Sequence, residues 1–149
     1  MKIRQANYND ISKIAELFDL YRQFYEQKSD ITGAKRYLQD RMEHGQSIIF
    51  IAEEPSSGNL VGFTQLYPVF SSISMQRSYI LNDLYVKAEN RKNGIAKLLI
   101  LEAKSFAKAF HGKGLELSTS IHNQGARSLY EKEGFMQETE FLTYFWKST

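Results

Sequence analysis

The sequence predicts an α/β protein in which a mixed β-sheet carries helices on both faces. An N-terminal strand is followed by two helical patterns, and hairpin-like strands occupy the middle of the chain. The second half alternates strand, helix, strand and helix, an order that favours neighbouring parallel strands. Because 149 residues contain no repeat and no linker, residues 1–149 are expected to form one domain.

The first two helices are predicted from apolar periodicity. Lys2–Ala6 is expected to form a short strand. Apolar residues at helical spacing then run from the capping residues Asn9 or Asp10 to about Gln27. A second helix is expected over Ile31–Glu43, with its charged residues outward.

Strand patterns dominate the middle of the chain. Ser47–Glu54 and Leu60–Tyr67 are expected to form a hairpin around the turn Pro55–Asn59. The polar segment Pro68–Ser74 is expected to be a loop, and Arg77–Val86 to be the next strand.

The remaining elements alternate. Gly94–Phe110 has a strongly helical pattern, and Leu115–Ile121 is expected to be a strand. A helix over Gln124–Glu133 follows, and Phe135–Trp146 supplies one or two final strands.

Composition excludes several classes of function. The chain has no cysteine, which removes disulfides, thiolate metal sites and cysteine nucleophiles. Its three histidines are scattered, and no metal site is expected. A net charge of +2 is too balanced to indicate nucleic-acid binding. The N-terminus does not resemble a secretory signal, and no apolar run reaches the roughly 18 residues of a membrane span, so a cytoplasmic protein without membrane contact is expected.

One loop has the composition of an anion site. Arg91, Lys92 and Gly94 lie between a predicted strand and the start of a predicted helix. The first turn of a helix has N–H groups without intrahelical partners, and the helix dipole adds positive charge there. Such an end binds phosphate oxygens, and a glycine lets them approach the backbone. A solvated helix entry is the alternative interpretation of this piece alone.

Two motifs together resemble a known family. Arg91-x-x-Gly94-x-Ala96 is followed about thirty residues later by Asn123-x-x-Ala126-x-x-Leu129-Tyr130-x-x-x-Gly134-Phe135. In this order and separation they are similar to the GNAT superfamily of N-acetyltransferases. The resemblance covers about residues 80–135 and implies a mostly antiparallel sheet with one splayed parallel pair of strands.

The resemblance implies acetyl-CoA as co-substrate and assigns residues to it. It implies that the pyrophosphate binds at Arg91, Lys92, Asn93, Gly94, Ile95, Ala96 and Lys97. The pantetheine arm would pair with the exposed backbone of Leu84, Tyr85 and Val86, and an N–H near Leu84 would stabilise the oxyanion. Asn123 would contact the cofactor arm, although it also fits a helix N-cap.

The resemblance also assigns catalytic roles. Tyr130 matches the tyrosine that protonates the leaving thiolate, and a phenol with a pKa near 10 keeps its proton at neutral pH. The alternative for Tyr130 is simple packing under Phe135. The likeness is nearest to polyamine and thialysine acetyltransferases, which carry Glu-Asp where this chain has Asn82-Asp83. Asn82 cannot act as a base, so Asp83 remains as the candidate catalytic carboxylate, and Asn82 is a candidate substrate contact. Because alternate residues of a strand face opposite sides, a buried structural role is the alternative for Asp83.

The acceptor pocket is predicted only by position. Tyr67 and Phe70 precede the central strand, together with Ser71 and Ser72. Glu26, on the first helix, is a candidate contact for a cationic substrate, and a solvated helix face is its alternative.

The leading hypothesis is therefore an N-acetyltransferase that acts on a primary amine of a small molecule. A non-catalytic acyl-CoA sensor and the acetylation of a protein or peptide amine are the alternatives. A homodimer is a further expectation, because the aromatic end Phe141–Trp146 could pack across an interface. That segment could equally be the last strand of the chain's own sheet.

Overall fold

The computed structural model describes all 149 residues, which fall into two compact units, 1–118 and 119–149. Each unit is described by itself, and the single domain remains a prediction. The larger unit contains the sheet and three helices. Its elements are β1 (Lys2–Gln5), α1 (Ile11–Phe24), α2 (Ile31–Glu43), β2 (Ile48–Glu53), β3 (Leu60–Ser71), β4 (Gln76–Val86), α3 (Ile95–Ala109) and β5 (Leu115–Glu116), with short 3₁₀ turns at Tyr8–Asp10 and Ala88–Asn90.

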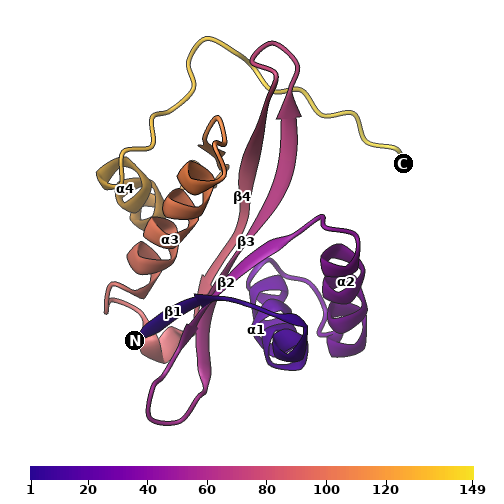
Figure 1. Cartoon of the computed structure of the whole chain (residues 1–149), viewed down its shortest axis with the longest axis vertical. Coiled ribbons are helices and arrows are strands. Elements are labelled where there is room, and N and C mark those ends of the chain that lie inside the picture. Colours follow the sequence, from indigo (N-terminus) through magenta and orange to yellow (C-terminus); the bar gives the residue numbers. More distant parts are fainter. The chain divides into compact units, whose positions relative to one another are not determined.

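The larger unit is a mixed five-stranded sheet in the order β1-β2-β3-β4-β5. The first four strands are antiparallel neighbours, and only β4 and β5 run parallel. Helices α1 and α2 lie on one side of the sheet and α3 lies on the other (Figure 1). The predicted fold class, a mostly antiparallel sheet between helices, is confirmed.

The parallel pair is splayed. β4 and β5 are in register only at Tyr79 with Leu115 and Ile80 with Glu116. From Leu81 to Val86, β4 keeps β3 as a partner on one side and has no strand on the other. The sheet therefore contains an open backbone edge in its interior.

Each face of the sheet has its own apolar core. The helices bury their periodic positions because these form one stripe along each helix. The core toward α1 and α2 consists mainly of Ile11, Ile14, Ala15, Leu17, Phe18, Ala34, Leu38, Ile49, Ile51 and Phe63. On the α3 side, the rings of Phe50 and Tyr79 each lie edge-on to Phe106, at 5.5 Å between centroids.

The N-terminal cap differs from the one predicted. Asn7 caps the first helical turn: its side chain accepts from the Asn9 N–H, and the Asp10 carboxylate accepts from the Asn7 N–H. Arg4 donates to both oxygens of Asp10 at 2.8 Å and also binds Glu53. These hydrogen bonds from Arg4 hold the pKa of Asp10 below its usual value. Asp10, one of the two predicted caps, occupies the N-cap position of α1, but its side chain makes no cap hydrogen bond there, because it binds Asn7 and Arg4 instead.

Two element boundaries also differ. α1 ends at Phe24 rather than near Gln27, and Glu26 follows it in the left-handed region with φ of 63°. β3 continues through Pro68 to Ser71, where a loop was predicted. β2 begins opposite Leu66, so the outer edge of β3 beyond that point has no partner. A proline there forfeits no hydrogen bond, because its missing N–H faces an open edge.

The smaller unit has one helix, α4 (Gln124–Lys132). The Asn123 side chain caps it by accepting from the Ala126 N–H at 3.1 Å, and Gly134 ends it with φ of 84°. The predicted strands over Phe135–Trp146 are wrong, because residues 135–149 contain no helix or strand. The predicted strand Leu115–Ile121 is reduced to Leu115–Glu116.

Candidate functional site

The N-terminus of α3 is open to a ligand. Gly94 precedes the helix with φ of 75°, a left-handed conformation that glycine adopts without steric cost, and no side chain caps the helix. A Cβ atom built on Gly94 would meet nothing within 4 Å. Lys92 is also left-handed, with φ of 63°. No side chain of the protein therefore caps the first-turn N–H groups, which a phosphate-binding turn requires to be available.

Two side chains of the loop before α3 donate hydrogen bonds to backbone carbonyls. Arg91 donates from Nε to the Val86 carbonyl at 2.9 Å, and its guanidinium lies over Tyr85 at 5.6 Å and Phe24 at 5.9 Å. Asn93 donates to the Asn90 carbonyl at 3.2 Å. Arg91 therefore ties the loop to β4 and to the end of α1, while its charge stays beside the start of α3.

β4 carries a bulge beside its open edge. Gln65 is opposite Asp83 and Leu66 is opposite Leu81, which leaves Asn82 as the extra residue. A bulge changes the direction of side chains and increases local twist. Asn82 is exposed, yet its amide donates to Asp83 Oδ1 at 2.9 Å. The bulge thus brings together two neighbouring side chains that a regular strand would place on opposite faces.

Asp83 is a buried carboxylate surrounded by neutral donors. Its exposed fraction is 2%. Gln65 Nε2 donates to Oδ2 and Asn82 donates to Oδ1, and the nearby Tyr21 side chain also acts to lower the pKa of Asp83. Burial raises the pKa of Asp83, and these hydrogen bonds offset the rise only in part. No cation is paired with the carboxylate, so it is a better proton acceptor than an exposed aspartate.

Gln65 connects Asp83 to Tyr67, a link that sequence reasoning missed. Gln65 is fully buried; its amide nitrogen also donates to the Tyr67 hydroxyl at 3.0 Å, and its oxygen accepts from Ser47 at 2.6 Å. The hydroxyls of Tyr67 and Tyr37 lie 2.8 Å apart. Burial, and secondarily the charge of Asp83, raise the pKa of Tyr67. The polar pair Thr64-Gln65 within an apolar strand is the pattern from which this network could have been predicted.

Aromatic rings line the approach to Asp83 from α1. The ring of Tyr21 lies edge-on to Tyr25 at 5.1 Å and to Tyr85 at 6.4 Å between centroids. The Tyr21 hydroxyl donates to the Asn82 carbonyl at 3.3 Å. Glu26 is exposed just beyond these rings in the chain. The end of α1 and the end of β4 thus form one continuous aromatic wall.

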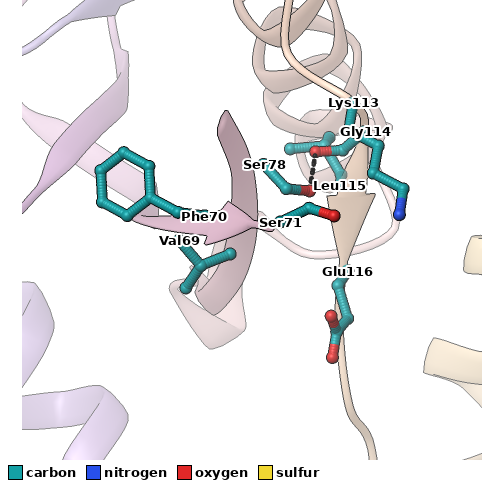
Figure 2. A pocket seen from close by; sticks show the side chains of 8 residues that line it. All are labelled: Val69, Phe70, Ser71, Ser78, Lys113, Gly114, Leu115 and Glu116. Carbon is teal, nitrogen blue, oxygen red and sulfur yellow. Dashed lines mark hydrogen bonds between the residues drawn. The ribbon is translucent and has the colours of Figure 1, made fainter. Parts of the chain in front are cut away.

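A cavity of about 350 Å³ lies at the other end of β4. β3 contributes Val69, Phe70 and Ser71, β4 contributes Ser78, and the segment Lys113–Glu116 completes the lining. Figure 2 shows the Ser78 hydroxyl turned toward the Gly114 carbonyl, to which it donates at 3.0 Å. The predicted pocket residue Phe70 belongs to this cavity, whereas Tyr67 belongs to the buried network.

In the smaller unit, the Asn123 and Tyr130 side chains both have structural contacts. The interpretation of Asn123 as a helix N-cap is confirmed. The Tyr130 ring lies edge-on to Phe135 at 5.9 Å, so the predicted packing against Phe135 is present. Their contacts with acetyl-CoA remain predictions.

No helix has both the length and the apolar character needed to cross a bilayer. No group of three or more histidine, aspartate or glutamate side chains is arranged to bind a metal ion.

Comparison with known proteins identifies the family. Residues 14–135 match the acetyltransferase (GNAT) family. The uncharacterized N-acetyltransferase YhfO of Bacillus subtilis is 49% identical over 97% of this chain and 95% of its own length. The crystal structure of a probable acetyltransferase matches with a TM-score of 0.96 and 37% identity over 100% of this chain and 99% of that one. A ribosomal-protein-alanine N-acetyltransferase from Brucella melitensis matches with a TM-score of 0.80 and 26% identity over 99% of both chains. The chain therefore belongs to the acetyltransferase (GNAT) family and is an acetyltransferase.

Proposed function

We propose that this acetyltransferase moves an acetyl group from acetyl-CoA to a primary amine of a small molecule, with polyamine-like and amino-acid-like amines as the acceptor classes. The observation that carries the proposal is the buried, uncompensated carboxylate of Asp83 at the bulge beside the open edge of β4. An amine is protonated at neutral pH and must lose a proton before it attacks a thioester. Asp83 supplies both a negative charge that attracts the ammonium group and a place for its proton.

The residues present fit acetyl-CoA. The uncapped start of α3, with open space at Gly94, suits the pyrophosphate, and the backbone N–H groups of Arg91 to Lys97 are its proposed donors. The open edge at Leu84, Tyr85 and Val86 suits the amide-bearing pantetheine arm, which would add to β4 in the manner of a short strand. Asn123 is proposed to contact the same arm.

The transfer is a direct attack. The amine nitrogen forms a bond to the acetyl carbon, and the bond from that carbon to sulfur breaks. In the tetrahedral intermediate the carbonyl oxygen is negatively charged, and a backbone N–H near Leu84 would donate to it. The leaving thiolate takes a proton from the Tyr130 hydroxyl, and the attacking nitrogen gives up its surplus proton, which returns to the Tyr130 phenolate through solvent. The products are neutral CoA and the acetylated amine.

The amine proton is proposed to reach Asp83 through Tyr21. The Tyr21 hydroxyl donates to the Asn82 carbonyl at 3.3 Å, and the Tyr21 side chain lies close enough to Asp83 to lower its pKa. A phenol can accept one proton as it donates another, whereas the amide of Asn82 only donates. Asn82 is therefore proposed to orient the carboxylate and to contact the acceptor at the surface.

The acceptor is proposed to bind on the side of the sheet that carries Asp83 and Tyr67. Phe70, which lines the cavity at the far end of β3 and β4, is proposed as a further contact for the acceptor. Glu26 is proposed to interact with a second positive charge on the acceptor. Asn82 in place of glutamate weakens the case for a polyamine, so thialysine-like and other amino-acid-like amines belong in the same test.

Two alternatives have specific support. The similarity to a ribosomal-protein-alanine N-acetyltransferase favours a peptide amine as the alternative acceptor. The absence of a glutamate at Asn82 favours a non-catalytic acyl-CoA sensor. A cytoplasmic location and a homodimer complete the proposal.

The decisive experiment measures release of free CoA thiol from acetyl-CoA with a panel of polyamines, lysine analogues, aminoglycosides and peptides. The protein has no cysteine and adds no thiol background. Rapid release with one class of small amine supports the proposal and identifies the acceptor. Release only with peptides favours the alternative acceptor. Acetyl-CoA binding without release across the panel contradicts the proposal and favours the sensor.

A further inference from the structure

The hydrogen bonds around Gln65 have a fixed direction while Asp83 is ionised. A carboxylate only accepts hydrogen bonds, so the Gln65 amide must turn its nitrogen toward Asp83. The Gln65 oxygen then faces Ser47, whose hydroxyl donates to it at 2.6 Å. An amide nitrogen has two hydrogens, and the second one points to the Tyr67 oxygen at 3.0 Å. The orientation of Gln65 therefore follows from the charge on Asp83.

The same direction continues from Tyr67 to Tyr37. The Tyr67 oxygen accepts from Gln65, and the Tyr37 oxygen lies 2.8 Å from it. Because a half-buried hydroxyl needs a partner for its single hydrogen, Tyr67 donates to the Tyr37 oxygen. Tyr37 thus takes part in this pair as the acceptor. Its own hydrogen points away from the network.

Tyr37 can present that hydrogen to a ligand. Its side chain is 37% exposed, whereas Gln65 and Asp83 are buried. Its ring stacks on Phe18 at 5.7 Å between centroids, with an angle of 8° between the planes. The guanidinium of Arg41 lies over the same ring at 5.0 Å. A fixed O–H donor beside a positive charge suits an anionic oxygen, since such hydrogen bonds are stronger than those between neutral groups.

We propose that the outward hydroxyl of Tyr37 donates to the carboxylate of an amino-acid-like acceptor. The ionised Asp83 gives this hydroxyl its direction through the Gln65 amide. A polyamine has no oxygen that the hydroxyl could bind, so Tyr37 would select amino-acid-like amines over polyamines. The inference rests on the proposed function, because the acceptor is proposed to bind on the side of the sheet that carries Asp83 and Tyr67.

Protonation of Asp83 would reverse the network. A protonated carboxyl has a hydrogen to donate, and Gln65 can then rotate its oxygen toward it. The Ser47 hydroxyl can turn to accept from the Gln65 nitrogen. Tyr67 would donate to the Gln65 oxygen and accept from Tyr37, whose hydrogen would turn inward. The acceptor carboxylate would therefore lose its hydrogen bond when Asp83 takes up the amine proton.

Calorimetry on the full chain saturated with CoA tests the carboxylate contact without turnover. The probes are amino acids and the amines that lack only the carboxylate: lysine with cadaverine, ornithine with putrescine, and phenylalanine with phenethylamine. In the wild type, at least one amino acid is expected to bind more tightly than its amine. Tyr37→Phe should weaken that amino acid by roughly 10-fold or more and leave the amine unchanged.

Tyr8→Phe is the matched control for the loss of a phenol. Tyr8 is exposed, and its hydroxyl contacts the same helix, α2, by donating to Glu43 at 2.8 Å. This variant should keep the wild-type preference. A panel in which no amino acid binds more tightly than its amine would overturn the proposal. A Tyr37→Phe protein that keeps the preference would also overturn it.

Asp83→Asn tests the direction of the network, because two explanations of its effect have opposite signs. The loss of a negative charge alone would strengthen carboxylate binding relative to the amine. Asparagine has an N–H to donate, so reversal of the network should instead remove the preference, as Tyr37→Phe does. A preference that rises in Asp83→Asn would overturn the proposal. Thiol release is measured separately: wild-type turnover in Asp83→Asn would contradict the proposed base, and the binding preference alone decides the role of Tyr37.

Discussion

Replacing Asp83 by asparagine removes the negative charge proposed for catalysis and keeps the size and shape of the side chain. The carboxylate accepts from Gln65 and Asn82, and asparagine has nearly the same shape. Gln65 can rotate its amide so that its oxygen faces the new NH₂ group, while its nitrogen donates to Ser47. The network is therefore expected to persist without the charge.

The two contributions to stability nearly cancel at Asp83. A hydrogen bond to a charged group is worth about 1 kcal/mol more than a neutral one, so the two bonds to Asp83 lose about 2 kcal/mol. Removing a buried charge without a cation regains several kcal/mol. The raised pKa means that ionisation costs folding free energy: that stability is present below the ordinary carboxyl pKa and is lost as the pH rises through the folded value. At neutral pH, the free energy of unfolding of Asp83→Asn should therefore be within about 1 kcal/mol of the wild-type value, or higher than it.

Asp19→Asn is the matched control. Asp19 is equally buried and accepts from Ser29 and the Asp30 N–H at 2.7 Å and from Gln23 at 2.9 Å. Burial raises the pKa of Asp19, but these bonds outweigh it and the pKa is lowered. Its ionised form thus stabilises the fold above the ordinary carboxyl pKa, and this is lost as the pH falls. The substitution should cost about 2 kcal/mol, a Tm lower by about 4–8 °C, with turnover unchanged.

The two variants should give opposite results in two assays. Asp83→Asn should lower turnover in the thiol-release assay by roughly 100-fold or more. The acidic fall of the wild-type rate should also disappear, because no carboxylate is left to protonate. Thermal unfolding tests stability without any acceptor. Equal turnover losses in both variants would refute the role of Asp83 as base, and an equal fall in Tm would refute the reasoning on its buried charge.

Three other positions test separate parts of the molecule. Gly94→Glu should abolish acetyl-CoA binding as measured by calorimetry. Gly94→Ala should only weaken it, since a left-handed alanine costs about 1–2 kcal/mol and adds no charge. Wild-type affinity in Gly94→Glu would show that the loop is not part of the site. Tyr130→Phe should lower turnover by roughly 100-fold with little change in acetyl-CoA affinity, and an unchanged rate would exclude Tyr130 as the acid. Asp10→Asn should lower the free energy of unfolding by about 2 kcal/mol at neutral pH, because it removes the ionised partner of Arg4. The pKa of Asp10 is lowered, so this stabilisation is present above the ordinary value of 3.8 and is lost as the pH falls below it. A Tm difference from wild type that persists unchanged in acid would contradict that role for the Arg4 pair.

Local pattern was sufficient for most of the fold. The helical stripes of α1, α2 and α3 and the hairpin of β2 and β3 follow from residue spacing alone. The failures are non-local. Pro68 reads as a strand breaker unless the length of β2 is known, because only then does its missing N–H face an open edge. The segment Phe135–Trp146 has a strand pattern, but pairing depends on an edge that its sequence cannot specify.

In the candidate site, too, some residues could be predicted from local spacing and others could not. Gly94 and Arg91 belong to a motif whose spacing is local, and the open start of α3 agrees with it. The relation between Asn82 and Asp83 could not be predicted from alternation, because a bulge overrides the two-residue period. Gln65 was missed because two of its partners, Ser47 and Asp83, each lie 18 residues away in the chain.

The open interior edge of β4 also makes the protein's resistance to unfolding depend on its surroundings. An unpaired stretch of strand is a template for association with other chains, so the unliganded protein carries a weakness that a pairing ligand removes. A molecule that occupies this edge in the native state alone stabilises it by about 2.7 kcal/mol when its concentration is 100 times its dissociation constant. The lifetime of the folded chain in a cell would then rise and fall with the supply of the molecule that binds there.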